Sequence, residues 1–133
     1  MSQENVESAR QALDAFNRRD KAAWSALNDP EFENVPPRDW PESDPIRGYE
    51  AVWDFFVEAQ DAWEEGAFEY GELSDAGNDK VLAHVRREAR GKASGASVVW
   101  SYWLVVTFRN GKAWRMEWFA NRAEALEAVG LRE

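Results

Sequence analysis

Apolar residues recur at helical spacing over the first part of the chain. They are Val6, Ala9, Leu13 and Phe16. This period predicts an amphipathic helix, which Ser2 can cap and which ends near Arg19. Asp20 is the expected N-cap of a short second helix, which ends at Asn28 before Pro30.

A longer helix is predicted from Arg47 to Glu65, with Gly66 as its C-cap. One of its faces is apolar through Tyr49, Val52, Trp53, Phe56, Ala59 and Trp63. Ahead of this helix, a brief strand over residues 31–35 leads into a proline-rich loop, residues 36–45, because proline cannot continue regular structure.

Beyond Gly66 the apolar period changes to two, which predicts strands. We expect them at residues 68–74, 80–90, 97–109 and 112–120. A last helix follows, because Asn121 and Glu124 have capping-box spacing and Gly130 can end it. Helices followed by an antiparallel meander predict one α+β domain over residues 1–133, with the helices on one face of a curved sheet.

Alternation within the strands predicts which side chains face the core. In the strand 97–109, the apolar set is Trp100, Tyr102, Leu104, Val106 and Phe108. In the strand before it, the inward set is Val81, Ala83, Val85, Arg87 and Ala89. Arg87 is therefore the one charge expected on the inner face.

The register of the last strand depends on the turn at residues 109–111. A two-residue Asn-Gly turn would place Arg115 and Glu117 inside, whereas a three-residue turn with a glycine bulge would place Trp114, Met116 and Trp118 inside. Burying two charges costs several kcal/mol per ion, so the bulged register is predicted. Arg115 and Glu117 then form an ion pair on the outer face.

Composition excludes several classes of function. The net charge of -9 disfavours a nucleic-acid partner, and the absence of cysteine excludes disulfides and thiolate chemistry. The single histidine, His84, excludes a histidine-based triad and multi-histidine metal sites, so we expect no metal and no cofactor. With no apolar targeting segment or membrane-length run, a soluble, cytoplasmic protein with no membrane partner is expected. The eight tryptophans must fill a core, line a cavity or cover an interface.

Several strings follow one another in order along the chain. They are DWPE followed by RGYEAVWDFF, SG within KASGA, TFRNGK, and NRAEALEAVGL. Together they resemble the SnoaL-like polyketide cyclase family, within the superfamily of nuclear transport factor two. The resemblance implies a conical α+β barrel, in which a strongly curved, mostly antiparallel sheet wraps on the long helix and a pocket lies between them. It also implies a homodimer formed through the outer sheet face.

Two enzyme classes of that superfamily offer further comparison. FENVP, residues 32–36, resembles the water-binding segment of limonene epoxide hydrolases, which implies that Phe32 and Asn34 stand where those enzymes hold the lytic water. Those enzymes also use an arginine and an aspartate two residues apart on one strand, and a second aspartate on the last strand. In this chain the three positions are Val85, Arg87 and Trp118, so both acids are missing and epoxide hydrolysis is expected to be absent. Ketosteroid isomerases use a general-base aspartate, and Asp39 lies in the corresponding region of the chain.

The expected ligand pocket combines these residues. It is lined by Phe32, Asn34, Trp40, Trp53, Phe56, Val85, Arg87, Trp100, Tyr102, Leu104, Met116 and Trp118. Arg87 and Tyr102 form a polar pair on an apolar face that could orient a carboxylate, enolate or carbonyl oxygen. The alternative is an arginine at the barrel rim that reaches Glu31, Glu33 or another acid.

Other candidates keep two interpretations. Asn34 is either a site residue or a strand-end cap, and Trp40 either covers the pocket mouth as part of a lid or anchors its loop. The leading hypothesis is binding of an apolar, cyclic small molecule. The alternative is an isomerase or cyclase with Asp39 or Glu33 as base and with Arg87 and Tyr102 stabilising an enolate. A third hypothesis is an interaction module without a pocket.

Overall fold

The computed structural model describes residues 2–37, 40, 44–60, 63–64 and 68–130. Its elements, in chain order, are α1 (Ser2–Asn17), α2 (Lys21–Leu27), β1 (Asn28–Val35), β2 (Ile46–Arg47), α3 (Tyr49–Gln60), β3 (Trp63–Glu64), β4 (Glu69–Gly77), β5 (Lys80–Gly91), β6 (Ser97–Arg109), β7 (Lys112–Phe119) and α4 (Arg122–Ala128). Among these elements, no helix is both long and apolar enough to cross a membrane.

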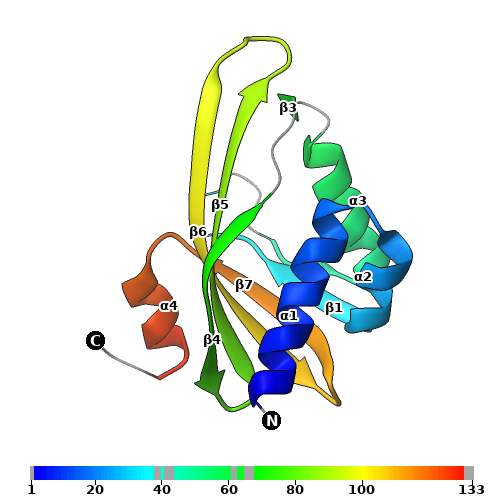
Figure 1. The fold of residues 1–133 in the computed structure, drawn as a ribbon, viewed down its shortest axis with the longest axis vertical. Coiled ribbons are helices and arrows are strands. Elements are labelled where there is room, and N and C mark those ends of the chain that lie inside the picture. Colours follow the sequence, from blue (N-terminus) through cyan, green and yellow to red (C-terminus); the bar gives the residue numbers. More distant parts are fainter. Residues whose placement is uncertain (1, 38–39, 41–43, 61–62, 65–67, 131–133) are drawn as a thin grey trace.

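The strands form one curved sheet in the order β2-β1-β7-β6-β5-β3, and β4 also pairs with β5 (Figure 1). The β1 and β7 strands run parallel, and the other pairs run antiparallel. The predicted α+β class with a mostly antiparallel sheet is confirmed. The barrel stays open, because the sheet ends at β2 on one side and at β3 and β4 on the other.

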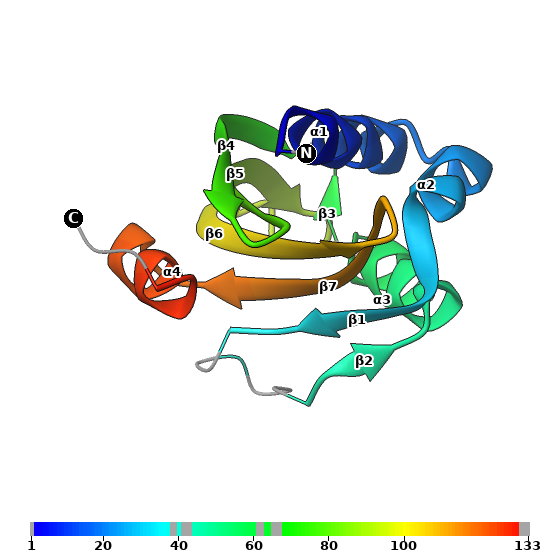
Figure 2. The same cartoon turned by 90° about the horizontal axis from the view of Figure 1, so that it is seen from below.

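Helices cover both faces of this sheet (Figures 1 and 2). On the concave face, Phe16 of α1, Trp24 of α2 and Phe56 of α3 belong to the main hydrophobic core. On the convex face, Leu126 of α4 packs in a second cluster with Val105 of β6. The prediction that all helices share one face is therefore wrong for α4, because the convex face has apolar positions of its own to bury.

Two of the N-caps predicted from the sequence, Asp20 and Asn121, are confirmed, whereas Ser2 is the first residue of α1 itself. Asp20 accepts a hydrogen bond from the backbone N–H of Ala23 at 3.1 Å, and Asn121 accepts one from that of Glu124 at 2.9 Å. These side chains satisfy backbone donors that a helix start leaves without a partner. The expected C-cap Gly66 lies outside the described residues.

The predicted long helix is shorter at both ends. Ile46 and Arg47 pair with β1 as the strand β2, and Gly48 turns the chain into α3 with a φ of +89°. The backbone N–H of Gly48 donates to the carbonyl of Phe32 at 2.8 Å, which fixes this corner against β1. At the other end, Trp63 belongs to β3 and pairs with Gly91, so its assignment to the helix is wrong.

The β6-β7 hairpin has the predicted register, but its turn differs from the expected one. Asn110 and Gly111 form a two-residue turn with φ values of +54° and +79°. The bulge lies within β7, opposite Thr107 and Phe108 of β6, between which the register shifts. Such a bulge inserts one extra residue and restores the inward facing of the positions that follow.

The position of the bulge decides the facing of each residue in β7. Met116 pairs with Val106 and Trp118 with Leu104, so both lie on the concave side as predicted. The bulge residue Trp114 does not, because its ring lies 4.8 Å from the guanidinium carbon of Arg109 on the outer side. The expectation of a three-residue turn assumed that the turn alone sets which side chains of the strand face inward. Because the bulge lies within the strand, the facing of the residues after it does not depend on the turn.

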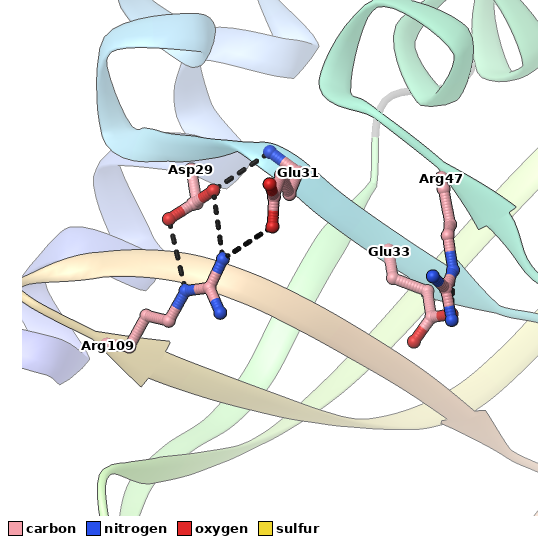
Figure 3. A network of polar contacts seen from close by, with 5 residues as sticks. All are labelled: Asp29, Glu31, Glu33, Arg47 and Arg109. Atoms are coloured by element: carbon pink, nitrogen blue, oxygen red, sulfur yellow. Dashed lines mark hydrogen bonds and ion pairs between the residues drawn. The ribbon is translucent and has the colours of Figure 1, made fainter.

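Ion pairs tie β1 to its neighbours (Figure 3). Arg109, at the end of β6, donates to Asp29 at 3.2 Å and to Glu31 at 3.1 Å. Glu33 of β1 accepts from Arg47 of β2 at 3.0 Å and lies 3.8 Å from Arg115 of β7. The carboxylates of β1 are therefore paired along the outer side of the sheet.

Asp29 gives the fold a measurable pH dependence. The hydrogen bond from Arg109, and then that from the backbone N–H of Glu31, hold the pKa of Asp29 below its ordinary value of 3.8. Stabilisation from a carboxylate with a lowered pKa is present in full above the unfolded-state pKa and is lost as the pH falls through the folded-state pKa.

We therefore expect the free energy of unfolding to fall as the pH drops below about 5. In Asp29→Asn this fall is smaller, and Arg109→Gln, which removes the main cause, gives the same flatter profile. Urea denaturation between pH 3 and pH 6 measures both. An unchanged slope in Asp29→Asn would contradict this account of the β1-β6 contact.

Candidate functional site

Two cavities lie between the concave face of the sheet and the helices. The first, of about 140 Å³, is called the aromatic cavity, and its residues are Trp40, Phe55, Phe56, Ala59, Phe68, Arg87, Trp100, Tyr102 and Trp118. The second, of about 70 Å³, is called the inner cavity and lies where α1 and α2 face strands β5, β6 and β7. Phe56, Phe68 and Trp118 line both cavities, so they form a partition between them.

The inner cavity has almost wholly apolar walls. Six of the expected pocket residues line it. They are Phe32, Val85, Leu104 and Met116, together with the partition residues Phe56 and Trp118. Its opposite wall is the apolar face of α1, including Ala9, Leu13 and Phe16. The helical period identified that face, but periodicity alone does not show whether an apolar face meets a filled core or a void.

The aromatic cavity is lined by six of the expected pocket residues, namely Trp40, Phe56, Arg87, Trp100, Tyr102 and Trp118, and by three that were not expected there. Phe55, Ala59 and Phe68 were missed. Phe68 lies outside regular structure, just before β4, where no alternation indicates the direction of a side chain. Phe55 lies beside Phe56 on α3, and the apolar face drawn on that helix was too narrow to include it.

Arg87 supplies a positive charge to the aromatic cavity. It pairs with Trp100 across the β5-β6 ladder, and its side chain points inward, as alternation predicts, with only 5% of the residue exposed. Its Nε is buried without a hydrogen-bond partner in the described part of the chain. The guanidinium carbon lies 5.3 Å from the ring centre of Trp100 and 5.8 Å from that of Phe68.

These surroundings are unfavourable for a cation. Burial lowers the pKa of Arg87 from its ordinary value, and the positive charge of Arg19 lowers it further. An arginine nevertheless keeps its proton, because the guanidinium is not deprotonated in proteins. Contacts with two rings contribute about 0.5–2 kcal/mol each, whereas burying an ion without a counter-charge costs several kcal/mol. Within the described residues, the positive charge in the aromatic cavity is therefore uncompensated.

The rim alternative for Arg87 named Glu31, Glu33 or another acid as its partner. Glu31 instead accepts from Arg109, and Glu33 accepts from Arg47 (Figure 3). Glu33 also lies 3.8 Å from Arg115. Neither acid forms an ion pair with Arg87 within the described residues.

Tyr102 is the second polar residue of the aromatic cavity. Its hydroxyl oxygen accepts a hydrogen bond from the indole N–H of Trp40 at 2.9 Å, and the two rings meet edge to face with centroids 5.9 Å apart. Trp40 therefore combines the two interpretations left open, because it anchors its loop and also lines the cavity. The proton of the Tyr102 hydroxyl has no acceptor among the described residues and can be donated into the cavity.

Trp118 is held in the partition by a buried hydrogen bond. Its indole N–H donates to Oδ1 of Asn34 at 2.7 Å, and Asn34 is fully buried. The side-chain nitrogen of Asn34 has no partner within the described residues. Asn34 therefore positions a cavity wall, and it lines neither of the two cavities.

Three further candidates lie away from the cavity walls. Trp53 packs in the core, with its ring 5.2 Å from that of Trp24, and lines neither cavity. Asp39 lies outside the described residues. His84 faces outward as predicted and stacks on Trp103 with ring centroids 4.5 Å apart.

This arrangement defines what the aromatic cavity can do chemically. Its described lining combines large rings with two hydrogen-bond donors, Arg87 and Tyr102, and includes no carboxylate. It can therefore enclose an apolar body and bind an oxygen-rich group, but it offers no general base from those residues.

The fold is that of nuclear transport factor two-like proteins. It is similar to such a protein of unknown function from Burkholderia pseudomallei, with a TM-score of 0.75 and 20% identity over 95% of this chain and 97% of that one. It is also similar to a putative SnoaL-like polyketide cyclase from a Jannaschia species, with a TM-score of 0.78 and 15% identity over 100% and 96% of the two chains.

A third similar structure is that of TerC co-crystallised with polyporic acid, with a TM-score of 0.75 and 20% identity over 96% of this chain and 98% of that one. At these identities the likeness concerns the fold. The model of the SnoaL-like domain matches residues 9–116, so the chain belongs to the SnoaL-like family. No curated protein matches the sequence.

The charge of Arg87 leads to a prediction about stability. Arg87→Met keeps the length of the side chain and removes the uncompensated charge, so we expect the free energy of unfolding to rise by about 1–4 kcal/mol. Urea denaturation at pH 7 in the absence of ligands measures this change.

Arg86→Met is the matched control for this prediction. Arg86 points outward and pairs with Glu69 at 2.9 Å and Glu88 at 3.5 Å. Exposed pairs of this kind contribute at most about 1 kcal/mol, so the control should lose a little stability. If Arg87→Met lowers stability more than Arg86→Met does, Arg87 has a stabilising partner and its charge is compensated.

Proposed function

We propose that this protein binds an apolar, cyclic small molecule in the aromatic cavity, with Arg87 and Tyr102 as polar anchors. The observation that carries the proposal is a cavity of about 140 Å³ whose aromatic walls converge on these two donors. Small-molecule sites commonly combine mostly apolar walls with a few polar groups that fix the orientation of the ligand.

Membership of the SnoaL-like family supports the same class of function. Of the similar structures, one is described as a putative polyketide cyclase, and TerC was crystallised with polyporic acid. Both descriptions concern small organic compounds, the class of ligand that this cavity is proposed to bind. The assignment to this chain rests on its own cavity, because one fold supports many functions.

The isomerase or cyclase alternative requires a base next to Arg87 and Tyr102. Glu33 does not line the aromatic cavity, and its carboxylate pairs with Arg47. A catalytic function would therefore depend on Asp39, which lies outside the described residues. Binding is the proposal that the described residues support by themselves.

The expected homodimer through the outer sheet face stays a prediction. On that face α4 covers Val105, so a second copy would have to pack beside α4 rather than over the whole sheet. Val99 is 51% exposed on β6, away from that cluster, and would lie in such a contact.

The binding proposal predicts that some ligands raise Tm, and that a larger side chain at the cavity mouth removes this increase. Steroids, aromatic polyketides and terpenoids are screened by thermal shift on the wild-type chain. A ligand at 100 times its Kd stabilises a protein by about 2.7 kcal/mol, which raises Tm by several degrees. Each active compound is then measured on Ala59→Phe, because Ala59 is an exposed residue on the wall of the aromatic cavity.

Ala51→Phe provides the matched control for this screen. Ala51 is exposed on the same helix and lines neither cavity. We expect the Tm increase to persist in Ala51→Phe and to disappear in Ala59→Phe. If no compound raises Tm, or if Ala59→Phe keeps the full response, the binding proposal is wrong.

A further inference from the structure

The charge balance of the aromatic cavity points to a class of ligand, on the condition that the proposed binding function holds. Arg87 is 5% exposed, lines the cavity and has no ion pair within the described residues. A buried cation without a counter-ion is unfavourable, so a ligand that brings a negative charge gains more on binding than a neutral ligand of the same shape.

The geometry of the donors narrows the type of anion. A guanidinium presents a planar set of N–H groups that matches a carboxylate with two parallel hydrogen bonds. Tyr102 is a diagonal neighbour of Arg87 across the β5-β6 ladder, because Val85 pairs with Tyr102 and Arg87 with Trp100. Diagonal neighbours in antiparallel sheets lie about 7–8 Å apart, a distance that these long side chains can close. One carboxylate can therefore accept from both residues.

The size and shape of the cavity limit how large the apolar part of the ligand can be. A volume of about 140 Å³ is close to that of an engineered apolar cavity of about 150 Å³ that holds benzene. Phe56 and Trp118 separate this space from the inner cavity, and their rings stack with an interplanar angle of 28°. A single six-membered ring therefore matches the volume of the aromatic cavity, whereas a fused polycycle would extend beyond it.

We propose that the aromatic cavity is a site for a single-ring aromatic carboxylate. Its ring lies among the aromatic walls, and its carboxylate pairs with Arg87 and accepts the hydroxyl proton of Tyr102. The ligand thereby supplies the negative charge that the described lining lacks.

Benzoate and benzamide test this proposal directly. They have the same ring and nearly the same shape, but only benzoate is charged at pH 7. Isothermal titration of the wild-type chain should show benzoate binding at least tenfold more tightly than benzamide. Acetate, which has the carboxylate without the ring, should bind at least tenfold more weakly than benzoate.

Two variants test whether Arg87 causes the preference for benzoate over benzamide. In Arg87→Met, the affinity for benzoate should fall at least tenfold, while the affinity for benzamide changes less than threefold. In Arg86→Met, which alters the neighbouring arginine on the other face of the same strand, both affinities should stay at the wild-type values. Thermal unfolding of each variant shows that the chain is folded before titration.

The outcomes separate this inference from the proposed function. If benzamide binds wild type as tightly as benzoate, or if Arg87→Met keeps the affinity for benzoate, the inference is wrong while binding in the cavity stands. If neither compound binds but a neutral compound from the wider panel does, the carboxylate proposal again fails alone. If neither these compounds nor any member of the panel binds, both proposals fail.

Discussion

The position of the Trp118 indole is the constraint on which both the core and the candidate site depend. It donates to Asn34 at 2.7 Å, stacks on Phe56 and meets Tyr102 edge to face with centroids 5.7 Å apart. These contacts join β1, α3, β6 and β7 at one point and separate the two cavities. The indole faces inward because the bulge at Trp114 shifts the register of β7 after the tight turn.

With that partition in place, the aromatic cavity is a small space with an unusual charge balance. Large rings enclose it, and its two polar residues are both donors, Arg87 and Tyr102. Glu31 and Glu33, two acids that were candidates to compensate the arginine, are paired with other arginines on the outer side of the sheet (Figure 3). The aromatic cavity is therefore left without a carboxylate in its described lining.

Local patterns were sufficient for most of the fold and for the central residues of the site. Alternation along β5 and β6 identified Arg87 and Tyr102 as inward-facing, because a buried face imposes a period of two on a strand. Patterns gave no signal for β2 and β3, which are too short to show a period. They predicted α4 as a helix but not its face of the sheet, which depends on packing against the convex side. The bond between Asn34 and Trp118 joins residues 84 positions apart, and only the folded chain reveals it.

The most direct test of this account is a crystal structure of the wild-type chain grown with benzoate. The account predicts electron density for the ring between the walls formed by Phe68, Trp100 and Trp118, with the carboxylate within hydrogen-bond distance of the Arg87 guanidinium. It would be contradicted by Arg87 paired with an acid of its own chain, or by an aromatic cavity without benzoate at a concentration that saturates binding in solution.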